Sequence, residues 1–314
     1  MKKTKKILIV LSILGFIGLL STCYMTGYFV FKGSMQLVTN ETTSSDYAEY
    51  LRENGIDKKL FDQMYSVEQI EIESTLDGHK IPADYMLADG DKNNDTVILV
   101  HGLGGNRLSL YPIAQIYLQY GYNVIAYDQR SSGENTALYT TGGYWESKDL
   151  LDYIQYIDGI IDQGKKIGVW GTSFGGATVG IALGDEMANN RLAFAVLDCP
   201  MSNIEYMIRE EIKTMDLDVP MDFLIGMGNI MTKLKLSFTY DDMNVVPYIS
   251  KTKVPVLILN SKADTLTPYF MGEELYKAIE HDQKKLFTVE DSKHADIFFD
   301  YQESYRNELL NFLP

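Results

Sequence analysis

VWGTSFGGAT, residues Val169 to Thr178, says more about the fold of this chain than any other stretch. A short apolar run ends at Trp170, and a helical pattern begins near Gly175. Between them, small residues surround Ser173 in the pattern Gly-x-Ser-x-Gly. Glycines at these places permit a crowded turn from a strand into a helix, which would lift the serine hydroxyl out of a sheet. We therefore predict that Ser173 is a nucleophile, and the alternative is an ordinary hydroxyl in a glycine-rich turn.

Strand and helix patterns alternate on both sides of this stretch. Apolar runs typical of buried strands lie at 96–100, 122–127, 166–170, 193–197, 254–259 and 285–289. Helical patterns lie at 108–120, 146–162, 175–188, 269–280 and 295–313. A helix is also expected at 46–65, and a hairpin at 67–88 around the turn Asp77-Gly78. The alternation predicts an α/β fold with a mostly parallel central sheet and helices on both faces.

One segment interrupts the alternation. Residues 201–249 separate two expected strands by far more chain than a short crossover needs. The segment is rich in methionine and other apolar residues, which predicts helices. We interpret it as a helical cap insertion over an active site, and a helical excursion without that role is the alternative.

The amino terminus has the pattern of a membrane segment. Four lysines in the first six residues precede an uncharged run from Ile7 to Phe31, and a run of that length can span a bilayer of about 30 Å. We favour an uncleaved transmembrane signal anchor over a cleaved signal peptide, whose apolar part usually has only about 7 to 15 residues. A lipoprotein-like segment ends at Cys23, but threonine before the cysteine fits poorly and the apolar run continues. Because only Lys32 directly follows the span, the N-terminus is expected in the cytoplasm and the rest of the chain outside the cell membrane.

These patterns divide the chain into three parts. Residues 1–31 form a cytoplasmic tip and transmembrane anchor, and residues 32–66 form a linker and an N-terminal helix. Residues 67–314 form the α/β domain, with the cap insertion at 201–249.

Composition bears on partners and cofactors. The net charge is −15, or −19 without the four N-terminal lysines, which disfavours nucleic acid or anionic lipid as the ligand of the external domain. Only Cys23 and Cys199 occur, and one lies in the apolar span, so we expect no intramolecular disulfide. The glycine-rich segment 101–106 lacks the lysine and the spacing of phosphate-binding loops, and no paired Cys/His set suggests a metal. We therefore expect neither a cofactor nor a metal.

A serine hydroxyl needs a base to become a nucleophile, and the chain offers four histidines. His79 lies in the hairpin turn and His101 ends the first buried strand, both upstream of Ser173. His281 lies near the end of an expected helix and is expected on the surface. His294 follows the last strand, where a loop could bring its ring over Ser173. We prefer His294 as the base, and a solvent-exposed loop histidine is the alternative.

The imidazolium that forms must be oriented and stabilised by a carboxylate. Asp264 stands in the loop after the expected strand 254–259, and order and spacing favour it over Asp198. Asp128 is expected instead to organise a turn with Arg130.

The tetrahedral intermediate of such a reaction needs two donors for its oxyanion. The N–H of Phe174, directly after the serine, is one candidate. The N–H of Leu103, in the glycine-rich segment HGLGGN, is the other.

Together these segments resemble the α/β-hydrolase superfamily. HGLGGN, YDQRSSGE, GTSFGG, LDCP, PVLILNSKAD and KHA are similar to segments of the membrane-anchored cell-surface hydrolases of Gram-positive bacteria, and the resemblance covers about residues 67–314. It implies that Ser173 is the nucleophile, His294 the base and Asp264 the acid, with an oxyanion hole at Leu103 and Phe174. Asn260-Ser261 stands where many relatives have His-Gly, a departure that we expect to shift the acid loop slightly.

The reaction expected from these residues is that of a serine hydrolase. The simplest form is a carboxylesterase that acts on a small, partly apolar acyl ester through an acyl-enzyme. A peptidase or amidase with the same residues is one alternative. A noncatalytic surface-binding protein on the same fold is another, and a cytosolic enzyme with a misread N-terminus is less favoured.

Overall fold

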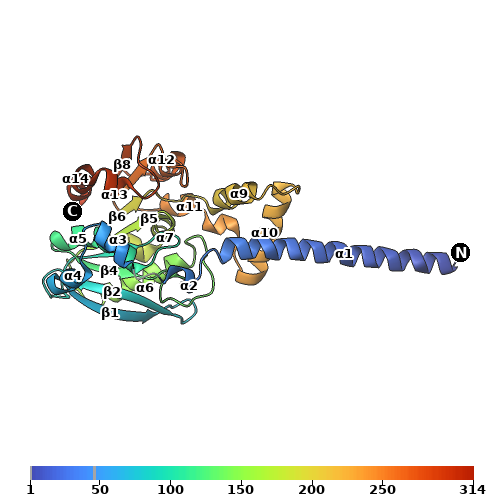
Figure 1. Cartoon of the computed structure of the whole chain (residues 1–314), viewed down its shortest axis with the longest axis horizontal. Helices are drawn as coiled ribbons and strands as arrows, with labels where there is room; N and C mark the ends of the chain where they lie inside the picture. The colour runs from blue at the N-terminus through green and yellow to red at the C-terminus, as the bar shows by residue number, and fades with distance from the viewer. Residues whose placement is uncertain (1, 45–46) are drawn as a thin grey trace. The chain divides into compact units, whose positions relative to one another are not determined.

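The structure, a computed structural model that describes residues 2–44 and 47–314, contains one eight-stranded sheet in its described part (Figure 1). Its strands are β1 (Ser66–Glu73), β2 (Lys80–Leu87), β3 (Thr96–Val100), β4 (Asn123–Tyr127), β5 (Ile167–Thr172), β6 (Leu192–Asp198), β7 (Val256–Ser261) and β8 (Lys284–Val289). The spatial order is β1-β2-β4-β3-β5-β6-β7-β8. β2 runs antiparallel to β1 and β4, and the other neighbouring pairs are parallel. The prediction of a mostly parallel sheet is confirmed.

Helices cover both faces of this sheet. They are η1 (Arg107–Leu110), α5 (Tyr111–Gln119), α6 (Glu146–Asp158), α7 (Phe174–Ala182), α8 (Glu186–Arg191), α11 (Val246–Ile249), α12 (Tyr269–Ala278), α13 (Ile297–Asp300) and α14 (Gln302–Phe312). Successive side chains of a strand point to opposite faces. In β7, Leu257 and Leu259 pack in the core cluster with α5 and α14, whereas Asn260 meets Gly272 of α12. The helices therefore form two layers with the sheet between them.

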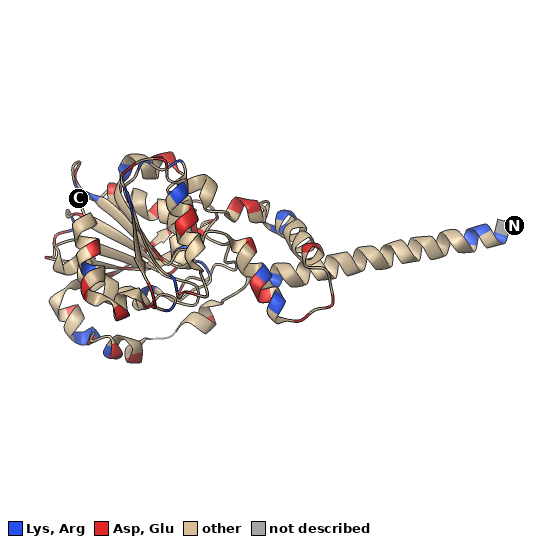
Figure 2. Cartoon of the chain, turned by 90° about the horizontal axis from the view of Figure 1, so that it is seen from above, with Lys and Arg blue, Asp and Glu red and all other residues tan. Residues whose placement is uncertain are grey.

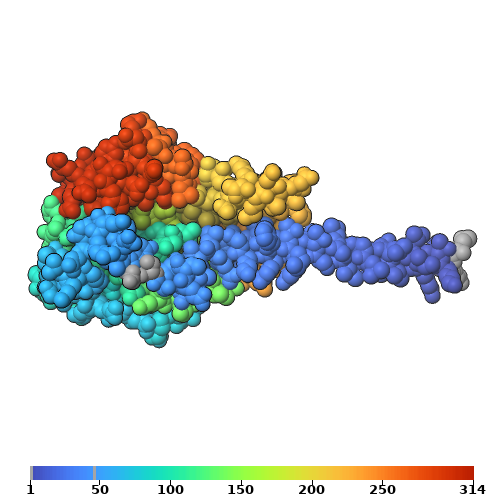
Figure 3. All heavy atoms as spheres, in the orientation of Figure 1, coloured from blue at the N-terminus to red at the C-terminus, as the bar shows by residue number. Residues whose placement is uncertain are grey.

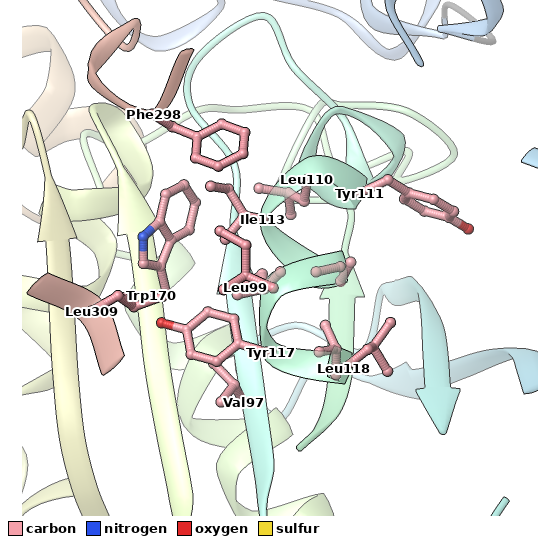
Figure 4. Packing of buried hydrophobic residues seen from close by; sticks show 14 of the residues in the cluster. Val97, Leu99, Leu110, Tyr111, Ile113, Tyr117, Leu118, Trp170, Phe298 and Leu309 are labelled. Carbon is pink, nitrogen blue, oxygen red and sulfur yellow. The ribbon is translucent and has the colours of Figure 1, made fainter. Parts of the chain in front are cut away.

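One of these layers fixes the end of β5. Val97 and Leu99 of β3 lie beside Tyr117 of α5, and Trp170 of β5 lies close to Leu309 of α14 (Figure 4). The indole N–H of Trp170 donates a hydrogen bond of 2.9 Å to the hydroxyl of Tyr305. Because Trp170 is anchored in the core, the chain leaves β5 from a fixed point three residues before Ser173.

The region before the sheet is more broken than the sequence pattern predicts. Instead of one helix at 46–65, the structure has α3 (Ala48–Glu53) and α4 (Lys58–Met64), and Asp46 lies outside the described residues. Gly55 separates the two helices with φ +74°, a left-handed conformation that glycine adopts without steric cost. Asp57 then caps α4 by accepting a 2.9 Å hydrogen bond from the N–H of Lys59. Within the expected linker, residues 40–43 form the short helix α2 (Asn40–Thr43).

The chain divides into two units, of which the sheet and its helices form the larger, Val38–Asn203 with Met243–Pro314. The smaller unit joins Met1–Leu37 to Ile204–Asp242 and contains α1 (Lys2–Met35), α9 (Ile204–Thr214) and α10 (Met221–Leu236). The insertion is therefore helical, as predicted. The division of the chain into domains that we derived from the sequence remains a prediction.

α1 is the one helix, among the residues that the structure describes, that is long and apolar enough to cross a membrane. Signal sequences and some core helices share that property. Lysines mark its N-terminal tip, and an uncharged length follows (Figure 2). This N-terminal length stands clear of α9 and α10 (Figure 3), and side chains such as Leu14 and Phe16 are more than half exposed.

The C-terminal part of α1 packs against α10 through glycines. A methyl group added to Gly27 would lie 2.7 Å from the carbonyl oxygen of Met227, and one added to Gly228 would lie 2.4 Å from Cγ1 of Val30. Small residues let two helix backbones approach this closely. The hydroxyls of Ser34 and Tyr240 add a buried hydrogen bond of 3.2 Å.

Candidate active site

Ser173 occupies a strained turn between β5 and α7. Its φ of 55° and ψ of −116° are rare for a residue with a side chain. A methyl group at Gly171 would lie 2.4 Å from the carbonyl oxygen of Gly175, and one at Gly175 would lie 2.2 Å from the carbonyl oxygen of Val100. The close approach of strand and helix therefore requires glycine two residues before and two residues after the serine.

A chain of hydrogen bonds connects Ser173 to two other predicted residues. The Nε2 atom of His294 lies 2.9 Å from Oγ of Ser173, and its Nδ1 atom lies 2.8 Å from Oδ2 of Asp264. An ionised carboxylate can only accept, so Nδ1 carries the proton and the lone pair of Nε2 faces the serine hydroxyl. The side chain of Asp264 is 1% exposed and that of His294 is 19% exposed. In this arrangement the imidazole can take the hydroxyl proton of Ser173.

Local hydrogen bonds keep the carboxylate of Asp264 ionised. Its Oδ1 atom accepts from the N–H groups of Leu266 (2.8 Å) and Thr267 (3.0 Å), an Asx turn, and the Thr267 hydroxyl lies 2.9 Å from Oδ2. Burial alone would raise the pKa of Asp264, but the hydrogen bonds from His294 and Thr267 hold that pKa below its usual value. Thr267 did not emerge from the sequence analysis, although Asp-x-x-Thr spacing is a signal for such a turn.

Asp198, the competitor of Asp264, supports the serine through its backbone. Its carbonyl oxygen accepts a 2.8 Å hydrogen bond from the N–H of Ser173. Its carboxyl group accepts a 2.8 Å hydrogen bond from the hydroxyl of Tyr305. Burial raises the pKa of Asp198 to about 6. The carboxyl group of Asp198 is thus bound to Tyr305, and the carboxylate hydrogen-bonded to His294 is that of Asp264.

Ser261, one of the two residues at which the sequence departs from the family that it resembles, ties the loop of Asp264 to the loop of His294. The hydroxyl of Ser261 donates a 2.6 Å hydrogen bond to the carbonyl of Ser292, two residues before His294. The same hydroxyl oxygen accepts a 3.2 Å hydrogen bond from the N–H of Ala263. Asp264 thus reaches His294 with Ser261 in place of the glycine of many relatives.

His101 shapes the loop that carries Leu103. Its Nε2 atom accepts a 3.0 Å hydrogen bond from the N–H of Gln129, and its Nδ1 atom lies 2.7 Å from the carbonyl oxygen of Gly102. Burial lowers the pKa of His101, which favours the neutral ring in this structural role. A methyl group at Gly102 would lie 3.5 Å from Cβ of Ser173, so the loop passes directly beside the serine.

The two expected oxyanion donors belong to segments next to Ser173. Leu103 follows Gly102 in the adjoining loop. Phe174 is the first residue of α7, a position whose N–H has no acceptor within the helix.

Two other histidines lie in other surroundings. His79 has its Nδ1 atom 2.6 Å from Oδ1 of Asp77, in the hairpin turn. His281 follows α12 and is half-buried, although we expected it on the surface. The structure brings neither of them to Ser173.

The expected partnership of Asp128 with Arg130 is wrong. Asp128 accepts a 2.8 Å hydrogen bond from the N–H of Arg107 and forms an ion pair with the guanidinium of Arg107. Arg130 instead reaches Asp149, with 2.9 Å between Nε and Oδ2, and Asp77, with 2.9 Å between its guanidinium and Oδ2. Asp128 does organise a turn, because the N–H of Glu134 donates to it over 2.9 Å.

One group of potential metal ligands occurs in the described part of the chain. Donor atoms of Cys199, Asp264 and His294 lie within 4.8 Å of one another. Burial raises the pKa of the Cys199 thiol well above its usual value, whereas metals bind the thiolate. His294 and Asp264 already share a hydrogen bond, so these residues fit proton transfer better than metal binding.

Comparison with known proteins identifies the fold. Residues 95–225 match the sequence model of the alpha/beta hydrolase fold family. Together with the sheet order and the strand-turn-helix at Ser173, this match shows that the chain has the α/β-hydrolase fold.

Individual relatives share this fold. Protein YqkD of Bacillus subtilis, which is uncharacterised, is 27% identical over 302 residues, covering 95% of both chains. The esterase Pf2001 of Pyrococcus furiosus superimposes with a TM-score of 0.63 at 23% identity, over 80% of this chain and 93% of that chain. Est1E of Butyrivibrio proteoclasticus, solved with ferulic acid bound, superimposes with a TM-score of 0.57 at 17% identity, over 77% and 98% of the two chains.

Proposed function

We propose that this protein is a serine hydrolase that cleaves carboxylic esters with a partly apolar acyl group. The observation that carries the proposal is the hydrogen-bonded series from Ser173 through His294 to Asp264. The hydroxyl oxygen of Ser173 attacks the acyl carbon while Nε2 of His294 takes its proton. The tetrahedral intermediate then collapses, and the leaving alcohol receives that proton. Water, deprotonated by the same nitrogen, attacks the acyl-serine and releases the acid and the free enzyme.

The oxyanion is stabilised in this scheme by the N–H groups of Leu103 and Phe174. The closeness of Gly102 to Ser173 and the position of Phe174 at the first turn of α7 support these two donors. Fixed donors of this kind stabilise the charge that develops on the carbonyl oxygen.

Exposed apolar side chains support a partly apolar acyl group. Leu103 in the glycine-rich loop is 44% exposed, and Leu266, two residues after Asp264, is 52% exposed. Apolar lining with a few polar groups is typical of small-molecule sites. The ferulic acid bound to Est1E is a partly apolar acid of the kind that such an esterase would release.

We also propose that α1 is an uncleaved anchor, with the N-terminus in the cytoplasm and the hydrolase unit outside the cell. The length of α1, its apolar character and the lysines at its N-terminus support this topology. In this proposal the helical insertion at 201–249 serves as the cap of the active site. The resemblance to Gram-positive cell-surface hydrolases agrees with the external location.

Replacement of the serine tests the proposed chemistry. Ser173→Ala should abolish labelling by a fluorophosphonate probe and turnover of p-nitrophenyl esters, because the hydroxyl that lies against Nε2 of His294 is that of Ser173, whereas the Thr267 hydroxyl lies against Nδ1. Ser250→Ala is the matched control, since the Ser250 hydroxyl donates to the carbonyl of Pro247 in its own turn, away from the predicted site. Undiminished labelling of Ser173→Ala would refute the assignment.

A substrate panel separates the alternatives. Rapid turnover of peptide substrates, with slow turnover of esters, would indicate a peptidase or amidase. Absence of labelling in the wild-type protein would indicate a noncatalytic binding protein.

A further inference from the structure

α10 carries an exposed apolar stripe formed by Phe223, Met227, Ile230 and Leu234. At about 100° of rotation per residue, these four positions fall within an arc of about 60° on the helix. Phe223 is 38% exposed, Ile230 52% and Leu234 72%, while Met227 is partly buried. Apolar side chains gathered on one exposed helix face are typical of an interaction surface.

The contacts of α10 with α1 show which way the stripe faces. α10 crosses α1 in Figure 1. Gly27 of α1 lies against Met227 and Met231, whereas Val30, nearly one turn further along α1, lies against Gly228. Met227 belongs to the stripe, and Gly228 is rotated about 100° beyond it. The stripe therefore lies on the side of α10 that faces the N-terminal length of α1.

The helix rise gives the position along α1, relative to the bilayer, at which α10 makes contact. At about 1.5 Å per residue, the segment from Ile7 to Thr26 is about 30 Å long, the thickness of a bilayer core. Gly27, which contacts α10, comes directly after that length. Tyr24 and Tyr28 are both exposed, and their rings stack with 6.3 Å between centroids. Tyrosines are enriched at the membrane-water boundary.

We propose that α10 lies in the outer boundary of the bilayer, with its apolar stripe against the lipid acyl chains. The stripe adjoins α1 at Met227 and faces the part of α1 that would span the membrane, so the apolar surface is continuous from one helix to the other. Lys233 and Lys235 are exposed on either side of Leu234, where their ammonium groups reach the lipid headgroups. The proposal rests on α1 being a membrane anchor and is independent of the hydrolase chemistry.

Fluorescent probes on the full-length chain test this placement. All labelled variants carry Cys23→Ser, and each receives one bimane label at a new cysteine. Leu234→Cys places the label on the stripe, and Glu211→Cys places it on the exposed polar face of α9. Leu14→Cys places it in the anchor. Native Cys199 is buried and its thiol has a raised pKa, so it escapes labelling. The protein is reconstituted in phosphatidylcholine vesicles and exposed to acyl-chain nitroxide lipid or to iodide on both sides.

The expected result is several-fold stronger quenching by nitroxide lipid at position 234 than at position 211, with the reverse order for iodide. Equal quenching of the two labels by both agents would overturn the proposal. Protection of the 234 label from both quenchers would also overturn it, because a second copy or another part of the chain would then cover the stripe. The 14 label is a separate control, since failure of lipid quenching there refutes the anchor itself.

Discussion

At Ser173, three backbone hydrogen bonds hold a conformation that few residues adopt. The N–H of Ser173 donates to the carbonyl of Asp198 over 2.8 Å. The carbonyl of Ser173 accepts from the N–H groups of Ala177 and Met201, each over 3.1 Å. With the backbone fixed in this way, only rotation about the Cα–Cβ bond is needed to aim the hydroxyl. In the proposed reaction, the attack position of the hydroxyl is therefore set before a substrate binds.

A pair of matched substitutions distinguishes the two carboxyl groups near this turn. Asp264→Asn should lower kcat by about 10³- to 10⁴-fold, because the amide cannot orient or stabilise the imidazolium of His294 as a carboxylate does. Asp198→Asn should keep kcat within about tenfold, because the backbone bond to Ser173 and an acceptor for Tyr305 both remain. Steady-state kinetics with a p-nitrophenyl ester measure both. A larger loss for Asp198→Asn would reverse the assignment of the acid.

The same two residues predict opposite dependences of stability on pH. The pKa of Asp198 is about 6 in the folded chain against an ordinary 3.8, so the folded state binds the proton more tightly. The stabilisation of the folded state by this tighter proton binding is fully present below the ordinary pKa and is lost as the pH rises to about 6. The free energy of unfolding changes by about 3 kcal/mol over this range. Asp198→Asn should therefore become more stable relative to the wild type over this range, as measured by urea unfolding.

Asp264 provides the control for that measurement. Its pKa is lowered by folding, so its contribution is present above its ordinary pKa and is lost as the pH falls. Asp264→Asn should accordingly lose stability relative to the wild type at neutral pH and approach it on acidification. If the free energy of unfolding changed with pH in the same direction for both variants, relative to the wild type, the surroundings described for the two carboxyl groups would be wrong.

At the scale of single elements, burial on both faces made the strands the most predictable parts. The pattern predicted β3 with its observed ends because all five of its residues are buried, so an apolar run and a strand coincide. The helix expected at 46–65 was wrong because Asn54-Gly55 ends α3, a stop signal that apolar spacing alone does not weigh. The partner of Asp128 was wrong for a different reason, since Arg130 is close to Asp128 in the sequence, whereas the fold brings Arg107 to it from 21 positions away.

The packing of α1 on α10 gives a prediction at this scale. Gly27→Val should separate the two helices, because the added atoms meet the backbone of Met227, at a cost of about 1 to 3 kcal/mol. Hydrogen exchange of the backbone amides of α10, measured on the full chain in detergent, should become several-fold faster. Gly18→Val is the matched control, because no atom from another element of the described structure lies within 4 Å of a methyl group at Gly18. Equal exchange in the two variants would show that the contact contributes nothing to the stability of α10.

At the scale of the whole molecule, topology explains how far the candidate site could be predicted. Three parallel strands, β5, β7 and β8, are followed in the chain by Ser173, Asp264 and His294. The carboxyl ends of parallel strands lie at one edge of the sheet, so the order of these residues in the chain predicted that they lie close together. Thr267 supports the site through one local turn, and nothing in the apolar pattern marks it. The joining of the N-terminal helix to the insertion could not be predicted, because their contacts depend on single glycines with no periodic signal.

The proposed topology is tested on intact cells. A protease added outside should remove the hydrolase unit from its anchor while a cytoplasmic marker protein stays whole. Immunoblots of cells and medium report both. Active protein in the medium without added protease would indicate a cleaved signal peptide, and resistance until lysis would place the hydrolase unit inside the cell.

The bond between Ser34 and Tyr240 joins residues 206 positions apart in the chain. During synthesis the ribosome releases α1 long before α10 exists, so the face of α1 that carries Gly27 has no partner helix until α10 is made. Any chain that stops before Met221 keeps that face open, and another helix with small residues can occupy it. With α1 as the proposed membrane anchor, premature termination of this gene would leave a peptide that can associate with other membrane helices.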